Sequence, residues 1–318
     1  MEQVPEERSA AEVARRDQLI GHLAFDFVLE MARGGIAGLK PLETLLIMAV
    51  NQANIAPLTR DPEARDRFGA LDSPAPDDMR RPVSVRAVAA SMRLPYETAR
   101  RNIKRLEQRG VCRVSGAGVV VPADFLLTPA YLETAVLGHD RMYGLYRVLR
   151  ARGLLDPLPP AQYLEGKPPI RAAVRLMSDF LLRSAEALDA RTGDLISSLV
   201  ILPLLAAAAG ANPGRATPQI SVAALARRVR LPSETVRRHV ASLTAAGLCE
   251  GQPRGVNLGD PTLASPLWRG LLRENAIAVQ RLYAGLSERG IVAVWDRLGA
   301  DGSPAQGSTP PGGSSSSG

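Results

Sequence analysis

The sequence has little cysteine and histidine. Its 318 residues include two cysteines, Cys112 and Cys249, and three histidines, His22, His139 and His239. Two cysteines cannot build the disulfide framework of a small secreted protein, and the scattered histidines lack the spacing of metal ligands. We therefore expect neither a metal site nor a bound cofactor.

Motifs that carry catalysis are missing as well. No serine lies in a nucleophile elbow, and no pair of carboxylates has a recognisable partner. Gly116-Ala117-Gly118 lacks the third glycine and the following helix of a dinucleotide-binding loop. We predict that the protein is not an enzyme.

Long hydrophobic segments are also absent. The N-terminal residues MEQVPEERSAAEVARRDQ have no apolar core of the kind found in a signal peptide. The longest apolar run, at 195–211, is short for a membrane span and is interrupted by Ser197, Ser198 and Pro203. We interpret it as a buried helix and expect a cytoplasmic protein.

Lysine is scarce although the chain is basic. Lysine and arginine together number 39 against 32 acidic residues, and only Lys40, Lys104 and Lys167 are lysines. The planar guanidinium suits phosphates and guanine edges, but a GC-rich genome produces the same arginine bias. Arginine content alone therefore leaves the function open.

The sequence contains one unit twice. Residues 83–119 align without a gap on 220–256, and 16 of the 37 aligned positions are identical. The same offset of 137 relates Tyr146 to Tyr283, whereas upstream an offset of 153 relates Phe27 to Phe180. The change of offset places about 16 extra residues in the first copy, most simply in the proline-rich, charged segment 61–78, which we predict to be a loop.

This repeat predicts the domain organisation. We expect an N-terminal extension at 1–16, a first unit at 17–155, a linker at 156–169, a second unit at 170–298 and a disordered tail of Gly, Ser and Pro at 299–318.

Within each unit the apolar residues follow a helical period. Short amphipathic helices are predicted from Val85 and Val222, and each precedes the same Arg-Leu-Pro turn. A longer helix follows and stops at Gly110 or Gly247, where a positive φ is expected. Its buried residues are Ala99, Ile103 and Leu106 in the first copy and Val236, Val240 and Leu243 in the second.

A glycine-containing β-hairpin comes next in both copies, and longer helices flank the helix-turn-helix and hairpin of each copy at both ends. The pattern predicts a mostly α fold with small β-hairpin wings, built as two tandem winged helix-turn-helix units with flanking helices. The helix-turn-helix segments lie at 84–110 and 221–247, the wings at 111–122 and 248–259, and the flanking helices at 41–55, 129–152, 194–209 and 266–289.

The strings LPYETARRNIKRLEQRGV and LPSETVRRHVASLTAAGL resemble the helix-turn-helix core of bacterial winged-helix transcription regulators. A unit of this length with flanking helices at both ends is also similar to one subunit of a MarR-type regulator. Members of such families bind duplex DNA as two-fold dimers. The resemblance therefore implies a dimer fused into one chain, with double-stranded DNA as its partner.

The outward side of the longer helix carries the candidate DNA-binding residues. In a major groove, its arginines would contact guanine edges or phosphates; the alternative is an ordinary solvated basic face. In the first copy the candidates are Glu97, Thr98, Arg100, Arg101, Lys104 and Arg105, with Arg113 and Ser115 in the wing. In the second copy they are Ser233, Glu234, Thr235, Arg237, Arg238 and Ser242, with Arg254 in the wing.

Several of these positions have two interpretations. Glu97 and Glu234 either accept from a cytosine amino group or, as we favour, interact with the helix N-terminus. The wing arginines reach phosphate or the minor groove, or extend into solvent. Cys112 and Cys249 are either redox-active or, as we favour, small residues buried under the wing. The helices at 129–152 and 266–289 form a packing seam between the copies more readily than an effector pocket.

We therefore predict a cytoplasmic, nucleoid-associated regulator of transcription that binds an imperfect palindrome as a monomer or homodimer, with an unidentified small-molecule effector left open. The first copy is more basic and should contribute more of the affinity. The alternatives are a plasmid-type replication initiator and a tandem winged-helix module that binds protein. Recovery of origin repeats would favour the initiator, and a non-basic helix face would favour the protein-binding module.

Overall fold

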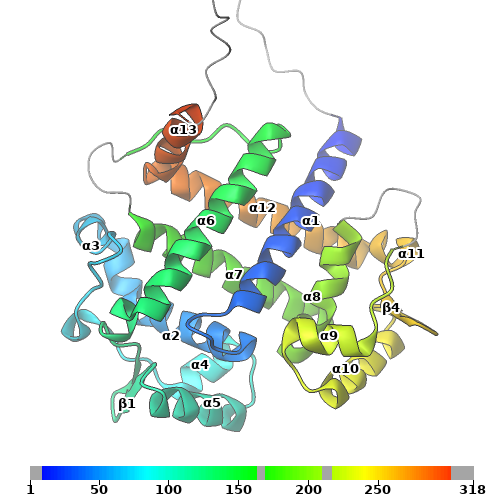
Figure 1. Ribbon diagram of the computed structural model, residues 1–318, viewed down its shortest axis with the longest axis horizontal. Helices are drawn as coiled ribbons and strands as arrows, with labels where there is room; N and C mark the ends of the chain where they lie inside the picture. Colours follow the sequence, from blue (N-terminus) through cyan, green and yellow to red (C-terminus); the bar gives the residue numbers. More distant parts are fainter. Residues whose placement is uncertain (1–8, 163–168, 210–216, 302–318) are drawn as a thin grey trace, which may run out of the picture.

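The computed structural model describes residues 9–162, 169–209 and 217–301. Over these residues the chain is mostly helical with two small antiparallel hairpins, which confirms the coarse part of the predicted fold (Figure 1). The first residues of the predicted extension, part of the predicted linker (163–168) and most of the predicted tail (302–318) lie outside the described residues.

The order of elements repeats along the chain. The first copy contains α1 (Ala10–Gly34), α2 (Pro41–Arg60), α4 (Val85–Ser91), α5 (Tyr96–Gln108), β1 (Arg113–Ser115), β2 (Gly118–Val120) and α6 (Pro129–Ala151). The second contains α7 (Ile170–Thr192), α8 (Leu195–Ala209), α9 (Val222–Val229), α10 (Ser233–Ala245), β3 (Glu250–Gln252), β4 (Gly255–Asn257) and α12 (Pro266–Glu288). Each of these seven elements of the first copy thus has its counterpart in the second.

Local sequence explains the boundaries of the two helix pairs, α4/α5 and α9/α10. Ser84 and Ser221 cap α4 and α9, because each hydroxyl accepts a hydrogen bond from a backbone N–H in the first turn. Gly110 and Gly247 follow α5 and α10 with φ of +71° and +67°, as predicted.

Each hairpin is tied back to its helix pair. Arg113 lies opposite Val120 in the first hairpin, and Glu250 lies opposite Asn257 in the second. A further backbone bridge joins Val83 to β2, and an equivalent bridge joins Ile220 to β4. The segment that enters each helix pair therefore fixes the position of the hairpin.

Four long helices, α1, α6, α7 and α12, lie above the two helix pairs in the view of Figure 1. Helix α1 packs mainly on α12 and α8, both from the second copy, and much less on α2 of its own copy. Tyr146 of α6 and Tyr283 of α12 stack with ring centres 5.8 Å apart, and the Tyr283 hydroxyl donates to the carbonyl of Met142. Contact between α6 and α12 is otherwise limited, because both helices pack mainly on α1 and α7, so the predicted seam between them is present only in part.

Two predictions about secondary structure need correction. The segment 61–78 is not simply a loop, because it contains α3 (Pro62–Arg67), which Asp61 caps, and the start of the short helix η1 (Asp77–Met79). Helix α13 (Ile291–Asp301) was not predicted, and it extends into the expected tail.

Candidate nucleic-acid interface

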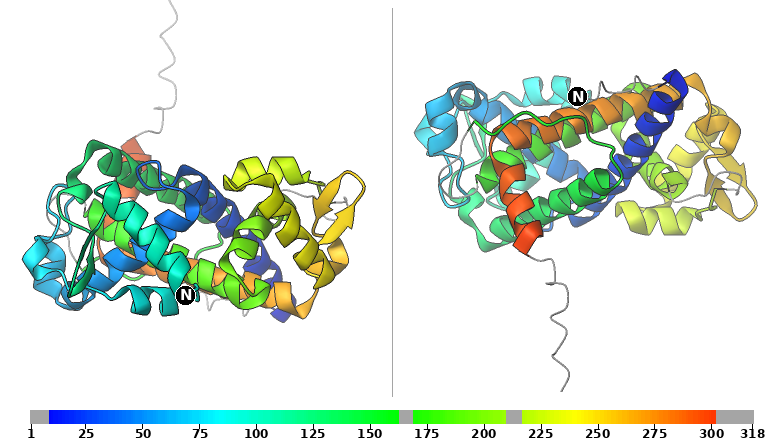
Figure 2. Two further views of the ribbon diagram at one scale, coloured as in Figure 1. Left: turned by 90° about the horizontal axis from the view of Figure 1, so that it is seen from below. Right: turned by 90° about the horizontal axis from the view of Figure 1, so that it is seen from above.

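Helices α5 and α10 both lie on the lower side of the molecule in Figure 1. The predicted apolar residues of both helices are buried. Asn102 is buried with them in α5, where its amide donates to the carbonyl of Thr98. The hairpins lie toward opposite ends of the long axis (Figures 1 and 2).

The outer face of α5 is a shallow, open depression. The structure brings six predicted residues and one neighbour together there: Glu97, Thr98, Arg100, Arg101, Lys104, Arg105 and Gln108. All of them are exposed except Thr98, which is half-buried. Arg101 and Lys104 form no ion pair with the described part of the chain. Their charges therefore remain available to a partner.

Two other arginines of α5 are held by carboxylates. Glu97 accepts from Arg100 at 2.9 Å, which raises the pKa of the guanidinium. Glu43 at the start of α2 is buried, and it lies 3.7 Å from Arg105 and 3.3 Å from Arg109. The contact between Glu97 and Arg100 is a third arrangement, beyond the two interpretations of Glu97 drawn from the sequence.

Helix α10 repeats part of this face. Glu234 contacts Arg237 at 2.5 Å, as Glu97 does Arg100, and Arg238 is exposed without an ion-pair partner among the described residues. Ser233 and Ser242 are exposed and Thr235 is half-buried. Ala241 and Ser242 replace the two cations Lys104 and Arg105 of α5, so the second face has less positive charge.

His239 gives α10 a contact that the sequence did not reveal. Its Nδ1 atom lies 2.9 Å from the Ser197 hydroxyl and 3.5 Å from Asp194, at the start of α8. Asp194 also accepts from the Ser197 backbone N–H. The inner side of α10 is thereby attached to α8.

The hairpins place their predicted residues differently. Arg113 contacts Asp77 at 2.6 Å and Asp124 at 3.1 Å, so much of its charge is compensated within the protein. The Ser115 hydroxyl accepts from the backbone N–H of Ala117 in its own turn. Arg254 is exposed at the turn of the second hairpin. Arg254 is thus better placed than Arg113 to contact a partner.

The Arg-Leu-Pro turns contain a feature that the sequence analysis missed. Arg93 and Arg230 have φ of +48° and +55°, a left-handed conformation that is uncommon for a residue with a Cβ atom. Arg93 lies 3.7 Å from the buried Asp189 near the end of α7, and Arg230 donates to the carbonyl of Leu39, just after α1. Each turn therefore contacts the other copy. The Arg-Leu-Pro tripeptide, identical in the two copies, was the sequence feature that could have indicated a shared role for these arginines.

Both cysteines are buried under the hairpins. Burial raises the pKa of Cys112 to about 12. Burial also raises the pKa of Cys249, and the hydrogen bond with the Thr244 hydroxyl partly opposes this rise. A thiol with a raised pKa has little of the reactive thiolate at neutral pH. The packing role is therefore favoured over the redox role.

The chain matches no known family model, no curated protein and no solved structure. Among the described residues, no group of three His, Cys, Asp or Glu side chains is arranged to hold a metal ion. No single described helix has the length and apolar composition of a membrane span; α7 and α8 meet these criteria only as a pair, which is bent by 102°. The exposed faces of α5 and α10 are therefore the features of the chain that bear most directly on its function.

Proposed function

We propose that the chain is a sequence-specific regulator of transcription that binds double-stranded DNA. In this proposal it consists of two tandem winged helix-turn-helix units that act as a pseudo-dimer on an imperfect palindrome. Helices α5 and α10 enter successive major grooves, with half-sites roughly 10 base pairs apart. The observation that carries the proposal is that α5 and α10, which lie on one side of the molecule, both have exposed arginines.

The ion pairs divide the predicted residues into two groups. Arg101, Lys104, Arg238 and Arg254 lack an ion-pair partner in the described chain and are proposed as the principal DNA contacts. Arg100, Arg105, Arg113 and Arg237 must share their charge with carboxylates, so each should add less.

Selection of genomic fragments by the purified chain tests this proposal. The selection is made at about 150 mM salt with excess competitor DNA, because affinity for phosphate alone falls steeply with salt. We expect a few fragments that share a spaced motif. The variant Arg101→Ala/Lys104→Ala should lose them.

The matched control is Arg15→Ala/Arg152→Ala, which also removes two exposed positive charges. Arg15 lies near the start of α1 and Arg152 follows α6, far from α5 (Figure 1). The control should retain the fragments. Equal loss in both variants would indicate nonspecific attraction, and origin-like repeats instead of promoters would indicate a replication initiator. If folded protein selects no fragment, the DNA-binding proposal is wrong.

A further inference from the structure

The Arg-Leu-Pro turn between α4 and α5 is a place where the first helix pair contacts the second copy. The Arg93 guanidinium lies 3.7 Å from the carboxylate of Asp189, near the end of α7. Arg93 is exposed, whereas the side chain of Asp189 is only 8% exposed. This ion pair therefore joins the first helix pair to a buried position in the other half of the chain.

Asp189 depends on Arg93 for charge compensation. Among the described residues, Arg93 is the one cation within ion-pair distance of Asp189. Burial raises the pKa of Asp189, and Arg93 opposes this rise. A buried carboxylate that loses its partner is costly, whereas an ion pair between two exposed side chains contributes little. Because one partner is buried, this contact holds the turn more firmly than a surface ion pair would.

The backbone of Arg93 indicates that its side chain has a specific role. Its φ of +48° lies in the left-handed region, which glycine enters without strain and a residue with a Cβ atom does not. A strained residue persists where its surroundings hold it in place. Here the Arg93 backbone N–H donates to the carbonyl of Ala90, and Asp189 binds the side chain. The ion pair therefore holds the turn, and with it the start of α5, against α7.

The apolar packing of the two helix pairs differs. Helices α9 and α10 share the large core of α1, α7, α8 and α12. Helices α4 and α5 pack in a separate core with α2, their hairpin and the start of α6. The first helix pair is therefore less firmly integrated with the long helices of the second copy.

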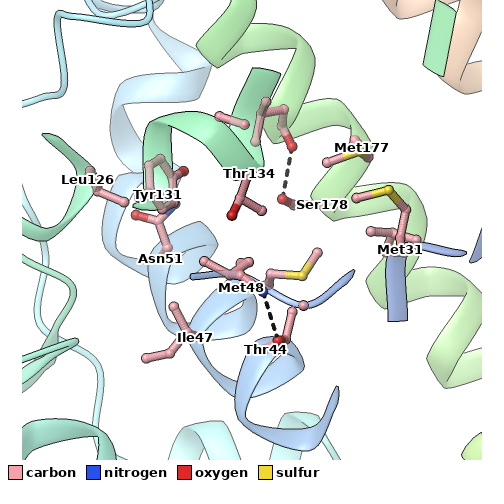
Figure 3. A pocket seen from close by; sticks show the side chains of 15 residues that line it. Met31, Thr44, Ile47, Met48, Asn51, Leu126, Tyr131, Thr134, Met177 and Ser178 are labelled. Carbon is pink, nitrogen blue, oxygen red and sulfur yellow. Dashed lines mark hydrogen bonds between the residues drawn. The ribbon is translucent and has the colours of Figure 1, made fainter. Parts of the chain in front are cut away.

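A small hollow lies where the supports of the first helix pair meet α7. Its walls include Ile47, Met48 and Asn51 of α2, Tyr131 of α6, and Met177 and Ser178 of α7 (Figure 3). Side chains around a hollow lack contacts that close packing would provide. Apolar packing alone therefore determines the orientation of α2, and of the helix pair on it, less strictly.

The turn of the second copy provides a comparison. Arg230 has a φ of +55° and donates to the carbonyl of Leu39 at 3.4 Å. Its acceptor is an uncharged carbonyl, and its helix pair is already held by the shared core. Loss of the Arg230 side chain should therefore matter less than loss of the Arg93 side chain.

We propose that Arg93 is a positioning residue that fixes α5 relative to α10 through its contact with Asp189, so that the chain accepts DNA half-sites at one spacing only. This inference rests on the proposed DNA binding and adds to it. One extra base pair between the half-sites moves one of them by about 3.4 Å along the DNA and turns it by about 35°. Two rigidly connected helices cannot follow this displacement, whereas two loosely connected helices can.

The first measurement needs no DNA. Spin labels are placed by Gln108→Cys and Ala245→Cys, at the exposed and equivalent last residues of α5 and α10. Pulsed electron resonance then reports the distance between the two helices. Cys112 and Cys249 are buried, and the wild type serves as the labelling control. We expect a narrow distance distribution that becomes about twofold broader when the ion pair is removed.

Two variants remove the ion pair from opposite ends. Arg93→Gly keeps the positive φ without strain, and Asp189→Asn leaves the Arg93 side chain in place. The matched control is Arg86→Ala, which removes an exposed charge from α4 and should leave the distribution unchanged. Arg230→Gly should broaden it less than Arg93→Gly does. Circular dichroism verifies the folding of each variant.

The second measurement compares fragments whose half-sites are one base pair closer or farther apart than in a selected fragment. The wild type should bind the selected spacing at least about tenfold more tightly, and this ratio should fall to about threefold in Arg93→Gly and in Asp189→Asn. Fluorescence anisotropy measures the affinities. A phosphate contact by Arg93 predicts another pattern, in which Arg93→Gly weakens all fragments equally and Asp189→Asn weakens none.

Three results would overturn the inference: unchanged distance distributions in both variants, an unchanged spacing ratio, or an effect of Arg93→Gly that Asp189→Asn does not reproduce. If the folded chain selects no DNA, the proposed function fails and the spacing rule fails with it, while the distance distributions still decide whether the ion pair fixes the two helix pairs. Failure of the inference alone appears as selected fragments with equal spacing tolerance in wild type and variants.

Discussion

In the second copy, helices α8, α9 and α10 share one hydrophobic core with α1, α7 and α12, whereas in the first copy α2, α4, α5 and the hairpin have a core of their own. The half with the separate core also has the more basic helix face. Similar sequences thus produce one half whose helix pair shares the core of the long helices and another whose helix pair has a core of its own.

Removal of a large buried aromatic side chain should give the largest difference in stability between variants of the two halves. Trp268→Ala should lower the free energy of unfolding by about 3–5 kcal/mol, because the side chain lies in a filled core. Tyr131→Ala should cost at least about 1 kcal/mol less, because Tyr131 already faces a hollow. Urea denaturation followed by circular dichroism measures both, and equal losses would contradict the difference in packing.

The second prediction concerns the unequal helix faces. With a selected DNA fragment, Arg101→Ala/Lys104→Ala should cost about 2–4 kcal/mol of binding free energy. Arg237→Ala/Arg238→Ala should cost about half as much, because Arg237 shares its charge with Glu234. Fluorescence anisotropy measures both affinities. Equal effects would show that the two faces contribute alike.

The third prediction uses two helical glycines as a matched pair. A Cβ atom at Gly21 would lie 2.6 Å from the carbonyl oxygen of Leu272, so Gly21→Ala forces α1 and α12 apart and should cost about 1–3 kcal/mol. Gly144 has no other atom within 4 Å of such a Cβ, so Gly144→Ala should stabilise α6 by about 0.5–1 kcal/mol. Thermal unfolding should give shifts of opposite sign, and shifts of one sign would refute the close packing at Gly21.

The smallest effect should appear as a pH dependence. Burial lowers the pKa of His22 below its ordinary value of 6.5. The unfolded chain therefore binds a proton at His22 more readily than the folded chain does. Above pH 6.5 the histidine is neutral in both states, and as the pH falls below 6.5 the free energy of unfolding decreases.

Replacement of His22 isolates this contribution. The stability advantage of wild type over His22→Gln should shrink between about pH 7.5 and pH 5.5, because glutamine does not titrate. Arg175, at the equivalent position in the second copy, stays charged over this interval. Urea denaturation at the two pH values measures the change. A constant difference between the proteins would mean that His22 is not desolvated.

The periodic parts of the fold were predictable from local sequence. Ala99, Ile103 and Leu106 identified the buried side of α5, and Gly110 marked its end, because these signals depend on neighbouring residues alone. The exposed positions of Arg101 and Lys104 followed from the same period. Whether these residues bind DNA is a prediction that the proposed experiments test.

Long-range contacts were not predictable in the same way. Arg113 was expected either to contact DNA or to extend into solvent, yet Asp77, 36 positions earlier, binds it. The packing of α1 against α8 depends on contacts between segments that are far apart in the sequence. The same is true of the contact between Arg171 and the ring of Tyr131. The extra segment 61–78 was predicted to be a loop because it is rich in proline and charged residues. It contains the short helix α3 and backbone carbonyls that accept hydrogen bonds from buried arginines.

The packing of α1 against α8 and α12 has a consequence for assembly and for variation. Two separate chains arranged in this way would dissociate on dilution, whereas the covalent connection here keeps both halves together at any protein concentration. A substitution in a symmetric homodimer also appears twice, so each change must be tolerated in both subunits. In this chain a substitution appears once, and each half is free to accumulate changes that the other half would not tolerate.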